Sequence, residues 1–432
     1  MVNRMDLSIF KGFTRLFFQT KVFLPMNILV LNCGSSSIKF QLFKMPDEVL
    51  LTQGKAEKNE SGNTRFLMKV SGKNRKFQFT GFSYQENLNR ILQELVRPSN
   101  NCLHALNELD VVGHRLIHSG DKNETKNVTV ITPEVIAYME SCTLLAPLHY
   151  PANLEGIRTI GKLLPEVIQA GVFDTAFHTT LPPRAFLYGI PLHWYLNHGI
   201  RRHGFHGTSH KYAVQQTCKI AGLPLENSKI VSCHLGNGAS LAAVKNGQSV
   251  DTSMGLTPVE GLLMGTRCGD IDAGVLVYLH ENFNLSVSEI QKLVNNEGGL
   301  LGLSGISSDF RAVEEAARKK HKAAQTALDV YCYRVKKYIG AYAAAMGGID
   351  ALVFTGGVGE NSVYARAEIC SGLEFLGIRI SQKLNAENNG SETVLNQPGA
   401  KVKIVIVPAN EELMIAREVA GWIKNKRPGI FQ

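Results

Sequence analysis

The sequence predicts an α/β protein built from two similar domains. Its 432 residues are too many for one ordinary core, which favours two domains of roughly 150–200 residues each. Strand-like and helical segments alternate along most of the chain, as in α/β folds. Two stretches, "LVLNCGSSSIKFQLF" at 29–43 and "VSCHLGNGASLAAVK" at 231–245, share the order strand, loop of small residues, strand. The chain therefore looks duplicated, and a cleft between the two domains would bring the two loops face to face.

The first half starts with strands and continues with helices and strands in turn. Leu88, Ile91, Leu92 and Leu95 form one apolar face and predict a helix over 84–96. Apolar or alternating runs predict strands at 27–32, 38–43, 64–70, 75–82, 111–117 and 167–173, with helices at 133–145 and 153–164.

The second half repeats this beginning. Asn246-Gly247 is a two-residue hairpin signal. Long helical stretches are expected near 311–346, and Gly347-Gly348 follows them as a C-cap would. Strands are expected at 229–234, 241–244, 248–252, 351–354 and 402–407, with loops at 235–240 and 355–362 ("TGGVGENS"), a helix from 361 or 362, and a C-terminal helix after "PANEE".

Net charge and cysteine content indicate which kind of partner the protein binds and in which cellular compartment it works. The net charge is +9, but Lys and Arg are spread along the chain, which favours small anionic substrates over nucleic acid or a membrane surface. Eight cysteines with no C-x-x-C pair suit free thiols in a reducing compartment, so we expect a cytoplasmic protein. No apolar run approaches the roughly 18–20 residues that span a bilayer. Residues 1–25 have charges among their apolar residues and no small-residue cleavage site, and are interpreted as an extension outside the domains.

Three loops of small residues, at 34–37, 236–240 and 356–359, each lie beside a predicted strand. Backbone amides and small hydroxyls can crowd against an anion, and Lys39 adds a cation to the first loop. Taken alone, that loop is better explained by a polar hairpin turn. It also lacks the P-loop pattern, because no glycine precedes Lys39 and no Ser or Thr follows it.

Charged residues also stand where a core would not place them. Arg115 ends a strand-like run in "VGHRLIHSG", and Asp174 follows an apolar strand in "GVFDTAFHTTLP". Arg267 lies in a glycine-bracketed loop, with Asp270 and Asp272 nearby. Each residue taken singly could make a surface ion pair, begin a turn or cap a helix.

The segment "RRHGFHGTSHKY" brings together His203, His206 and His210. Their spacing lacks the H-E-x-x-H pattern of a helical zinc site, and no G-x-S-x-G elbow suggests a serine hydrolase. With the two arginines, Asp174 and the acidic pair Glu411-Glu412, the chain instead holds what phosphoryl transfer needs. That reaction requires donors around phosphates, cations over the transferring group and oxygen ligands for magnesium.

In order and spacing, a set of motifs from Met26 to about Gly421 resembles the acetate kinase family. The motifs are "NCGSSSIKF", "GHRLIHSG", "FDTAFH", "GFHGTSH", "HLGNGAS", "DTSMGLTPVEGLLMGTRCGDID", "FTGGVGENS" and "PANEEL". The resemblance implies the fold of the sugar kinase, heat-shock ATPase and actin superfamily: two duplicated actin-like ATPase domains with the active site between them. It also implies reversible transfer of the γ-phosphoryl group of ATP to acetate, giving acetyl phosphate and ADP with magnesium, for which manganese can substitute.

The resemblance further implies domain bounds and an oligomeric state. Domain I is expected at 26–176 together with 409–432, and the nucleotide-binding domain II at 177–408. A homodimer is expected from the family alone, and small molecules are the expected partners, with neither nucleic acid nor membrane.

Residue roles follow from the matched motifs. Arg115 matches the arginine that binds the substrate, His206 and Arg267 match proposed transition-state stabilisers, and Asp174 matches the essential aspartate. Because acetate is already ionised at pH 7, no proton has to be removed, and we expect Asp174 to orient Arg115 or a magnesium-bound water. Magnesium is expected at Asn32 and Glu411. Nucleotide contacts are expected at Ser35, Ser37, Lys39, His234, Leu235, Gly236, Asn237, Gly238, Asp309, Phe310, Arg311, Gly357, Val358, Gly359, Glu360 and Asn361.

Substrate choice depends on an acyl pocket expected at Ile117, Leu148, Phe205 and Pro258. Ile117 stands where acetate kinases often have valine and propionate kinases alanine, and it leaves less room for a longer chain, which favours acetate. One methylene is worth only roughly 1–3 kcal/mol, so a kinase for propionate or another short-chain carboxylate is the alternative. A nucleotide-gated binding protein is the alternative from another class, and it would not need the internal arginines Arg115 and Arg267.

Overall fold

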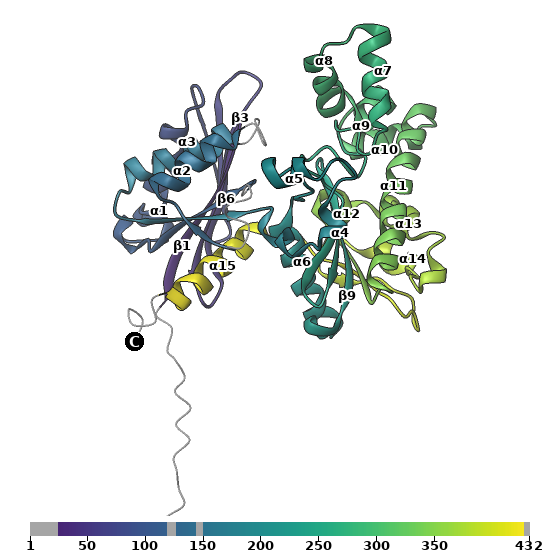
Figure 1. The fold of residues 1–432 in the computed structure, drawn as a ribbon. Coiled ribbons are helices and arrows are strands. Elements are labelled where there is room, and N and C mark those ends of the chain that lie inside the picture. Colours follow the sequence, from purple (N-terminus) through teal and green to yellow (C-terminus); the bar gives the residue numbers. More distant parts are fainter. Residues whose placement is uncertain (1–24, 119–126, 144–149, 427–432) are drawn as a thin grey trace, which may run out of the picture.

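The computed structural model describes residues 25–118, 127–143 and 150–426, which fold into two β-sheets flanked by helices (Figure 1). Apart from Pro25, the expected N-terminal extension at 1–25 lies outside these residues. The predicted α/β class with two mixed sheets is confirmed.

The first sheet has eight strands in the order β5-β4-β3-β2-β1-β6-β8-β7. Strands β1 to β5 pair antiparallel with their neighbours, whereas β6 and β8 continue the sheet in parallel with β1. The strands are β1 (Met26–Gly34), β2 (Ser37–Met45), β3 (Val49–Lys58), β4 (Thr64–Val70), β5 (Lys73–Phe79), β6 (Val111–Leu116), β7 (Thr129–Val130) and β8 (Ile168–Phe173).

Both faces of this sheet are covered by helices, because alternate residues of a strand point to opposite faces. Leu29 and Leu31 of β1 pack with α1 and α3, whereas Ile28 and Val30 pack with α15. Figure 1 shows α15, the last helix of the chain, returning to the first sheet. That return is expected if residues 409–432 belong to domain I, while the bounds 26–176 and 177–408 stay predictions. The helices are α1 (Tyr84–Leu95), α2 (Pro133–Ser141), α3 (Tyr150–Leu163) and α15 (Glu411–Lys426).

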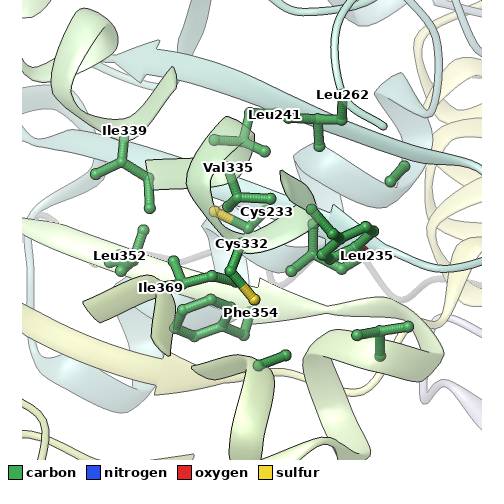
Figure 2. Packing of buried hydrophobic residues seen from close by; sticks show 14 of the residues in the cluster. Cys233, Leu235, Leu241, Leu262, Cys332, Val335, Ile339, Leu352, Phe354 and Ile369 are labelled. Carbon is green, nitrogen blue, oxygen red and sulfur yellow. The ribbon is translucent and has the colours of Figure 1, made fainter. Parts of the chain in front are cut away.

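The second sheet has six strands in the order β11-β10-β9-β12-β14-β13. Cys233 and Leu235 of β9 face α11 in a closely packed apolar cluster with Phe354 (Figure 2), whereas Ile230 faces α6. The strands are β9 (Lys229–Leu235), β10 (Ala239–Lys245), β11 (Gln248–Thr252), β12 (Ala351–Thr355), β13 (Thr393–Val394) and β14 (Lys403–Ile406). The helices of this half are α4 (Pro183–Phe186), α5 (His193–His198), α6 (Gly207–Ala221), α7 (Ala273–Phe283), α8 (Val287–Lys292), α9 (Gly299–Ser304), α10 (Phe310–Arg318), α11 (Lys322–Met346), α12 (Gly356–Asn361), α13 (Val363–Cys370) and α14 (Gln382–Glu387).

The two sheets confirm the duplication. The order β3-β2-β1-β6-β8-β7 in the first corresponds strand by strand to β11-β10-β9-β12-β14-β13 in the second. The senses agree as well, since each has antiparallel hairpin strands, then two parallel strands, then a short antiparallel strand.

The predicted hairpins are also confirmed. Gly34 pairs with Ser37 across the turn between β1 and β2, and Leu235 pairs with Ala239 between β9 and β10. At the turn between β10 and β11, Asn246 and Gly247 have φ of 55° and 76°. Two consecutive positive φ values are what a type I′ turn requires, which is why an Asn-Gly pair predicts it.

Other local predictions were wrong. Strand β3 was not predicted, because Thr52 and Ala56 are its only fully buried residues and its sequence has little apolar alternation. The predicted loop "TGGVGENS" contains α12, whose glycines have weak helix propensity. Gly356 has φ of +79°, and a Cβ there would lie 2.8 Å from the Leu235 carbonyl oxygen. Close packing against β9 therefore selects glycine at the start of this short helix.

The helical stretches predicted near 311–346 are α10 and α11, which are separated at residues 319–321. Lys320 there has φ of 65°, and His321 caps α11 through its side chain. Helix α2 ends at Ser141, short of the predicted 145.

In the described part of the chain, every helix is too short or too polar to cross a lipid bilayer. All eight cysteines are free thiols, as expected.

Candidate active site

A cavity of about 290 Å³ gathers residues from both halves of the chain. Gly34 and Ser37 come from the β1–β2 turn, and Gly238 comes from the corresponding β9–β10 turn. The two hairpin loops predicted to face each other therefore line one cavity. Its full lining is Asn32, Gly34, Ser37, Lys39, Arg115, Ile117, Asp174, Phe205, His206, Gly238, Met254, Pro258 and Arg267.

Arg115 and Asp174 meet because β6 and β8 are parallel neighbours whose carboxyl ends lie at the same sheet edge. The Arg115 guanidinium contacts the Asp174 carboxylate twice, with Nε 3.2 Å from Oδ1 and Nη2 2.7 Å from Oδ2. Its Nε also lies 3.0 Å from Oε2 of Glu411, at the start of α15. Among the described residues Nη1 has no protein partner, so that side of the guanidinium is left for a ligand.

Carboxylates outnumber cations around this guanidinium. Burial raises the pKa of Asp174, and Glu411 adds to the effect against the opposing charge of Arg115. The pKa of Glu412 is also raised, by burial first and then by Glu411. For Arg115, burial would lower the pKa, but Asp174 and Glu411 outweigh it and the pKa is raised. Arg115 therefore stays protonated, and the extra carboxylate charge favours a further cation nearby.

Lys39 and Arg267 add positive charge to the lining of this cavity. Among the described residues, neither Lys39 nor Arg267 forms an ion pair, although both line the cavity. The nearest polar contact of Arg267 Nη1 is Met264 Sδ at 3.7 Å. Burial lowers the pKa of Arg267 from its very high usual value, which leaves the side chain charged at neutral pH. Two cations of this kind favour a bound anion.

His206 reaches the cavity from the N-terminus of α6. The Gly207 amide donates to the Asp174 carbonyl at 3.0 Å, and a Cβ on Gly207 would lie only 2.2 Å from that oxygen. Glycine is therefore needed for this approach. The His206 ring stacks on His234, with centroids 4.2 Å apart. Burial first, then His234 and Arg115, hold the pKa of His206 well below its usual value, so the ring is neutral at pH 7.

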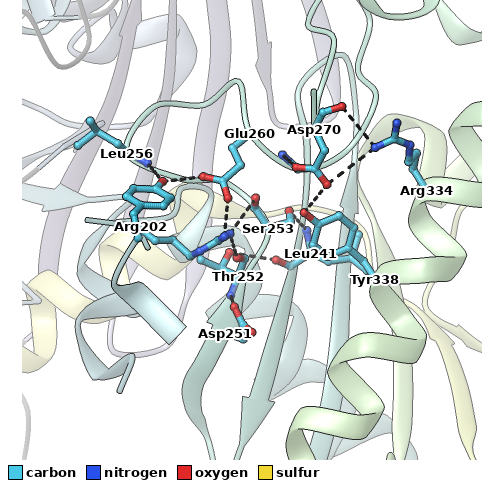
Figure 3. Close-up of polar contacts among 12 residues, drawn as sticks. Arg202, Leu241, Asp251, Thr252, Ser253, Leu256, Glu260, Asp270, Arg334 and Tyr338 are labelled. Carbon is cyan, nitrogen blue, oxygen red and sulfur yellow. Dashed lines mark hydrogen bonds and ion pairs between the residues drawn. The ribbon is translucent and has the colours of Figure 1, made fainter. Parts of the chain in front are cut away.

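The loop that carries Arg267 is held by Arg202 at one end (Figure 3). Arg202 forms an ion pair with Glu260 and donates to the carbonyl oxygens of Thr252 at 2.6 Å and Ser253 at 3.2 Å. The Tyr188 hydroxyl donates to Glu260 at 2.6 Å.

Asp270 holds the other end of the same loop (Figure 3). It accepts hydrogen bonds from the Gly261 amide and the Tyr338 hydroxyl, both at 2.8 Å. Arg267 therefore lies between two fixed points. Of these anchors, only Asp270 was singled out from the sequence. Arg202 and Glu260 were missed because they are far apart in the chain and no sequence motif pairs them.

A second cavity of about 780 Å³ adjoins the same hairpin. Gly236 and Asn237 of the β9–β10 turn line this cavity, whereas the next residue, Gly238, lines the first. The turn therefore stands between the two cavities. A ligand reaching from one to the other would pass along its backbone. The lining is Gly236, Asn237, Leu300, Ser308, Asp309, Phe310, Arg311, Glu314, Gly357, Val358, Asn361 and Ser362.

Several predicted site residues line neither cavity. Ser35 lies in the exposed β1–β2 turn, and the Leu235 side chain is buried in the core, so only its backbone could reach a nucleotide. Glu360 accepts from the backbone amides of Gly356 and Ala409, each at 2.8 Å, and so joins two loops. Gly359 is buried, and His234 stacks behind His206. Leu148 lies outside the described residues.

Other lining residues were not predicted. Met254 lines the first cavity, and Leu300, Ser308, Glu314 and Ser362 line the second. Met254 belongs to the quoted "DTSMG" motif, but nothing in its residue type indicates a ligand contact. The remaining four come from separate turns and helices that only the fold brings together.

The residues at the first cavity fit a magnesium ion carried by a nucleotide. The Asn32 side chain lines the cavity without a protein partner among the described residues, and the carboxylates exceed the cations around Arg115. Within the described ranges, no group of three His, Cys, Asp or Glu side chains is placed to hold a metal by itself. Magnesium usually binds one or two protein carboxylates together with substrate phosphates and water, so this sparse donor set suits it.

Comparison with known proteins identifies the family. The profile of the Acetokinase family matches residues 27–417. The chain belongs to the acetokinase family. It is similar to acetate kinase from Carboxydothermus hydrogenoformans, with 48% identity over 402 residues, 93% of this chain and 100% of that protein. Acetate kinase from Dictyoglomus turgidum is 47% identical over 93% of this chain and 98% of its own length.

Two solved structures are similar to this chain in fold. Porphyromonas gingivalis acetate kinase superposes with a TM-score of 0.85 and 46% identity, covering 92% of this chain and 100% of that one. A propionate kinase from Francisella tularensis has a TM-score of 0.83 and 39% identity, covering 91% and 98%. Solved structures described as an acetate kinase and a propionate kinase therefore both share this fold.

Proposed function

We infer that this acetokinase family member is an acetate kinase, which transfers the γ-phosphoryl group of ATP reversibly to acetate and yields acetyl phosphate and ADP. The inference rests on similarity to acetate kinases over almost the whole chain. The structural observation that carries it is the pair of cavities joined at the β9–β10 turn, one large enough for a nucleoside and one lined by Arg115, Lys39 and Arg267.

The nucleotide takes the larger cavity in this proposal, with its phosphates along the turn. The Gly236 amide already donates to the Gly238 carbonyl at 3.1 Å, so the amides of Asn237 and Gly238 are the ones offered to the phosphate oxygens. Lys39 supplies charge from the facing hairpin. The terminal phosphoryl group then lies in the smaller cavity. Acetate and the γ-phosphoryl group of ATP are both negatively charged, so their approach needs the cations of that cavity.

Acetate binds at Arg115. Its Nη1 side faces away from Asp174 and Glu411 and is available to the acetate carboxylate. Ile117, Phe205 and Pro258 line the same cavity and are placed to receive the methyl group. Two contacts to Asp174 fix the orientation of Arg115, which supports a positioning role for that carboxylate rather than a role as general base.

In the transfer step an acetate oxygen attacks the γ-phosphorus as the bond from that phosphorus to the β,γ-bridging oxygen breaks. The electron pair of the broken bond leaves with ADP, so atoms and charges balance without a proton transfer. Arg267 and neutral His206 donate hydrogen bonds to the equatorial phosphoryl oxygens. Loss of one such preorganised donor costs about 10²–10³ in rate.

Magnesium, or manganese in its place, would neutralise charge on the phosphates when bound. Asn32 and Glu411 are the residues we propose to hold it, and both have oxygen donors of the kind it prefers. Asp174 contributes negative charge beside them.

The exposed face of α7 and α8 supports a homodimer. Neither helix buries a residue, although Val277 is 54% exposed, Tyr278 57% and Val287 77%. Figure 1 shows both helices projecting at one end of the second half. We expect Val277→Asp to reduce the mass measured by analytical ultracentrifugation. The free thiols support a cytoplasmic location.

The test of the reaction is ADP release by purified protein with MgATP and increasing acetate, propionate or butyrate. We expect the highest kcat/KM with acetate. A higher value with propionate would keep the mechanism and move the chain to the alternative substrate. Absence of carboxylate-dependent turnover, with ATP still bound, would instead indicate a nucleotide-gated binding protein.

A further inference from the structure

We propose that His210, Ser240 and Ser232 are positioning residues that fix the tautomer of His206, so that its Nε2 carries a proton and faces the transferring phosphoryl group. The four side chains form one continuous row of hydrogen bonds from the core to the cavity. The proposal rests on the proposed function only for the identity of the group that His206 faces.

The row is set up by the packing of α6 on the second sheet. His206 is the N-cap of α6 and His210 lies in its first turn, with the His210 amide donating to the His206 carbonyl at 2.9 Å. Ser232 of β9 and Ser240 of β10 point to the sheet face that α6 covers. His206 Nδ1 lies 2.9 Å from Ser240 Oγ, and His210 Nε2 lies 2.8 Å from the same oxygen. His210 Nδ1 lies 2.9 Å from Ser232 Oγ.

Both imidazoles are neutral, which makes the row directional. Burial first holds the pKa of His210 and that of His206 well below their usual value. A neutral imidazole has one donor nitrogen and one acceptor nitrogen, and a hydroxyl has one proton to donate. Ser240 can therefore donate to one ring only, and if it accepted from both rings its own buried proton would have no acceptor. The tautomers of His206 and His210 are consequently linked.

Ser232 decides between the two possible directions. It is fully buried, and among the described residues His210 is the sole partner of its hydroxyl. If the row ran from His206 toward Ser232, the Ser232 proton would be buried without an acceptor, which is costly. In the opposite direction Ser232 donates to His210 Nδ1, His210 Nε2 donates to Ser240, and Ser240 donates to His206 Nδ1. Every proton in the row then has an acceptor, and the remaining proton is on His206 Nε2.

That nitrogen lies at the reacting side of the cavity. A Cβ built on Gly238 would be 3.6 Å from His206 Nε2 and 3.4 Å from Arg267 Nη1, and all three residues line the smaller cavity. A protonated Nε2 donates to a phosphoryl oxygen, whereas an unprotonated one would present a lone pair to that anion. The buried row thus determines whether His206 attracts or repels the group in transfer.

The test measures tautomers directly by ¹⁵N-histidine NMR of the intact protein without nucleotide. We expect His206 and His210 each to have a protonated Nε2 and an unprotonated Nδ1, with signals assigned from His206→Gln and His210→Gln. His178 serves as an internal reference. Its Nε2 must donate to the Phe205 carbonyl at 3.0 Å, and its Nδ1 accepts from Ser249 at 2.8 Å. Protonated Nδ1 on His206 or His210 would overturn the proposal, and this readout does not depend on activity.

Kinetics give the second readout. Ser240→Ala removes the donor to His206 Nδ1, and we expect kcat to fall about tenfold, the equivalent of one net hydrogen bond, while KM for ATP and acetate stays unchanged. Ser240→Thr keeps a hydroxyl and should restore most of the rate.

Ser249→Ala is the matched control, because it removes an equally buried serine from a histidine outside the row. Equal losses of kcat in Ser240→Ala and Ser249→Ala, or no loss in Ser240→Ala, would contradict the proposal. If wild-type protein turns over no carboxylate, the proposed function fails while the NMR result still stands.

Discussion

Asp174 holds the Arg115 guanidinium at two points. Nε of Arg115 lies 3.2 Å from Oδ1 of Asp174, and Nη2 lies 2.7 Å from Oδ2. The contact comes from neighbouring parallel strands, and Glu411 touches the same guanidinium from α15, the last helix of the chain. Arg115 is therefore fixed before any substrate arrives. Such preorganisation lowers the cost of ordering the group when acetate binds.

Asp174→Asn tests whether this carboxylate positions Arg115. An amide keeps the shape but weakens both contacts, so we expect kcat/KM for acetate to fall by about 10²–10³. KM for ATP should change little, because the second cavity is lined by other residues. Steady-state kinetics with each substrate varied in turn provides the measurement. Near-normal turnover would contradict the positioning role.

Ile117→Ala tests the acyl pocket. Ile117 lines the smaller cavity and is only partly buried between two apolar clusters, so its removal should enlarge the space without unfolding the chain. We expect kcat/KM for propionate to rise relative to acetate by about 10-fold or more, since a methylene contributes roughly 1–3 kcal/mol. The ratio of kcat/KM for propionate to kcat/KM for acetate is also measured for Ile117→Val, which should change this ratio less than Ile117→Ala does. An unchanged ratio would remove Ile117 from the pocket.

Glu260→Gln tests whether the network in Figure 3 supports Arg267. The variant loses the ion pair to Arg202 and weakens the contact from Tyr188, at a cost of about 1–3 kcal/mol in the free energy of unfolding. We expect kcat to fall as well, because the loop then holds Arg267 less firmly. Tyr188→Phe is the milder control, as it removes one hydrogen bond and leaves the ion pair. If Glu260→Gln lowered the stability but left kcat unchanged, the network would support the fold only and would not position Arg267.

Buried histidines predict loss of stability in mild acid. Burial lowers the pKa of His114, His178 and His234 to about 4, below the usual 6.5 of the unfolded chain. Between pH 6.5 and 4 the unfolded state binds more protons, so the free energy of unfolding decreases as pH falls through this window. Each such histidine contributes a slope of up to about 1.4 kcal/mol per pH unit.

His114→Gln isolates one of these contributions. His114 lies in β6 with its Nε2 2.8 Å from the Gln169 side chain, away from the reacting groups. Chemical denaturation at several pH values should give a shallower pH dependence for the variant than for the wild type. Parallel curves for the two proteins would contradict the lowered pKa of His114.

Much of the fold could be predicted from the sequence because its signals are local. Asn246-Gly247 specifies a turn by its own backbone preferences, and the matching loops at 34–37 and 236–240 indicated the duplication that the sheets confirm. Local rules failed where packing overrides propensity. The glycines of α12 are selected by the approach of β9, and β3 forms because strands on both sides offer partners to a weakly apolar segment.

The sequence by itself determined the chemistry of the candidate site. Arg115, Asp174, His206 and Arg267 were all singled out from residue types that do not belong in a core, and the fold gathers them at one cavity. Tertiary structure alone decided how these groups are held. The Arg202–Glu260 pair spans 58 residues, and Ser232 and Ser240 meet His210 only because α6 lies across β9 and β10. Which atom donates in a buried hydrogen bond depends on all the other partners of the two groups. In this protein those partners come from distant segments that no local sequence pattern connects.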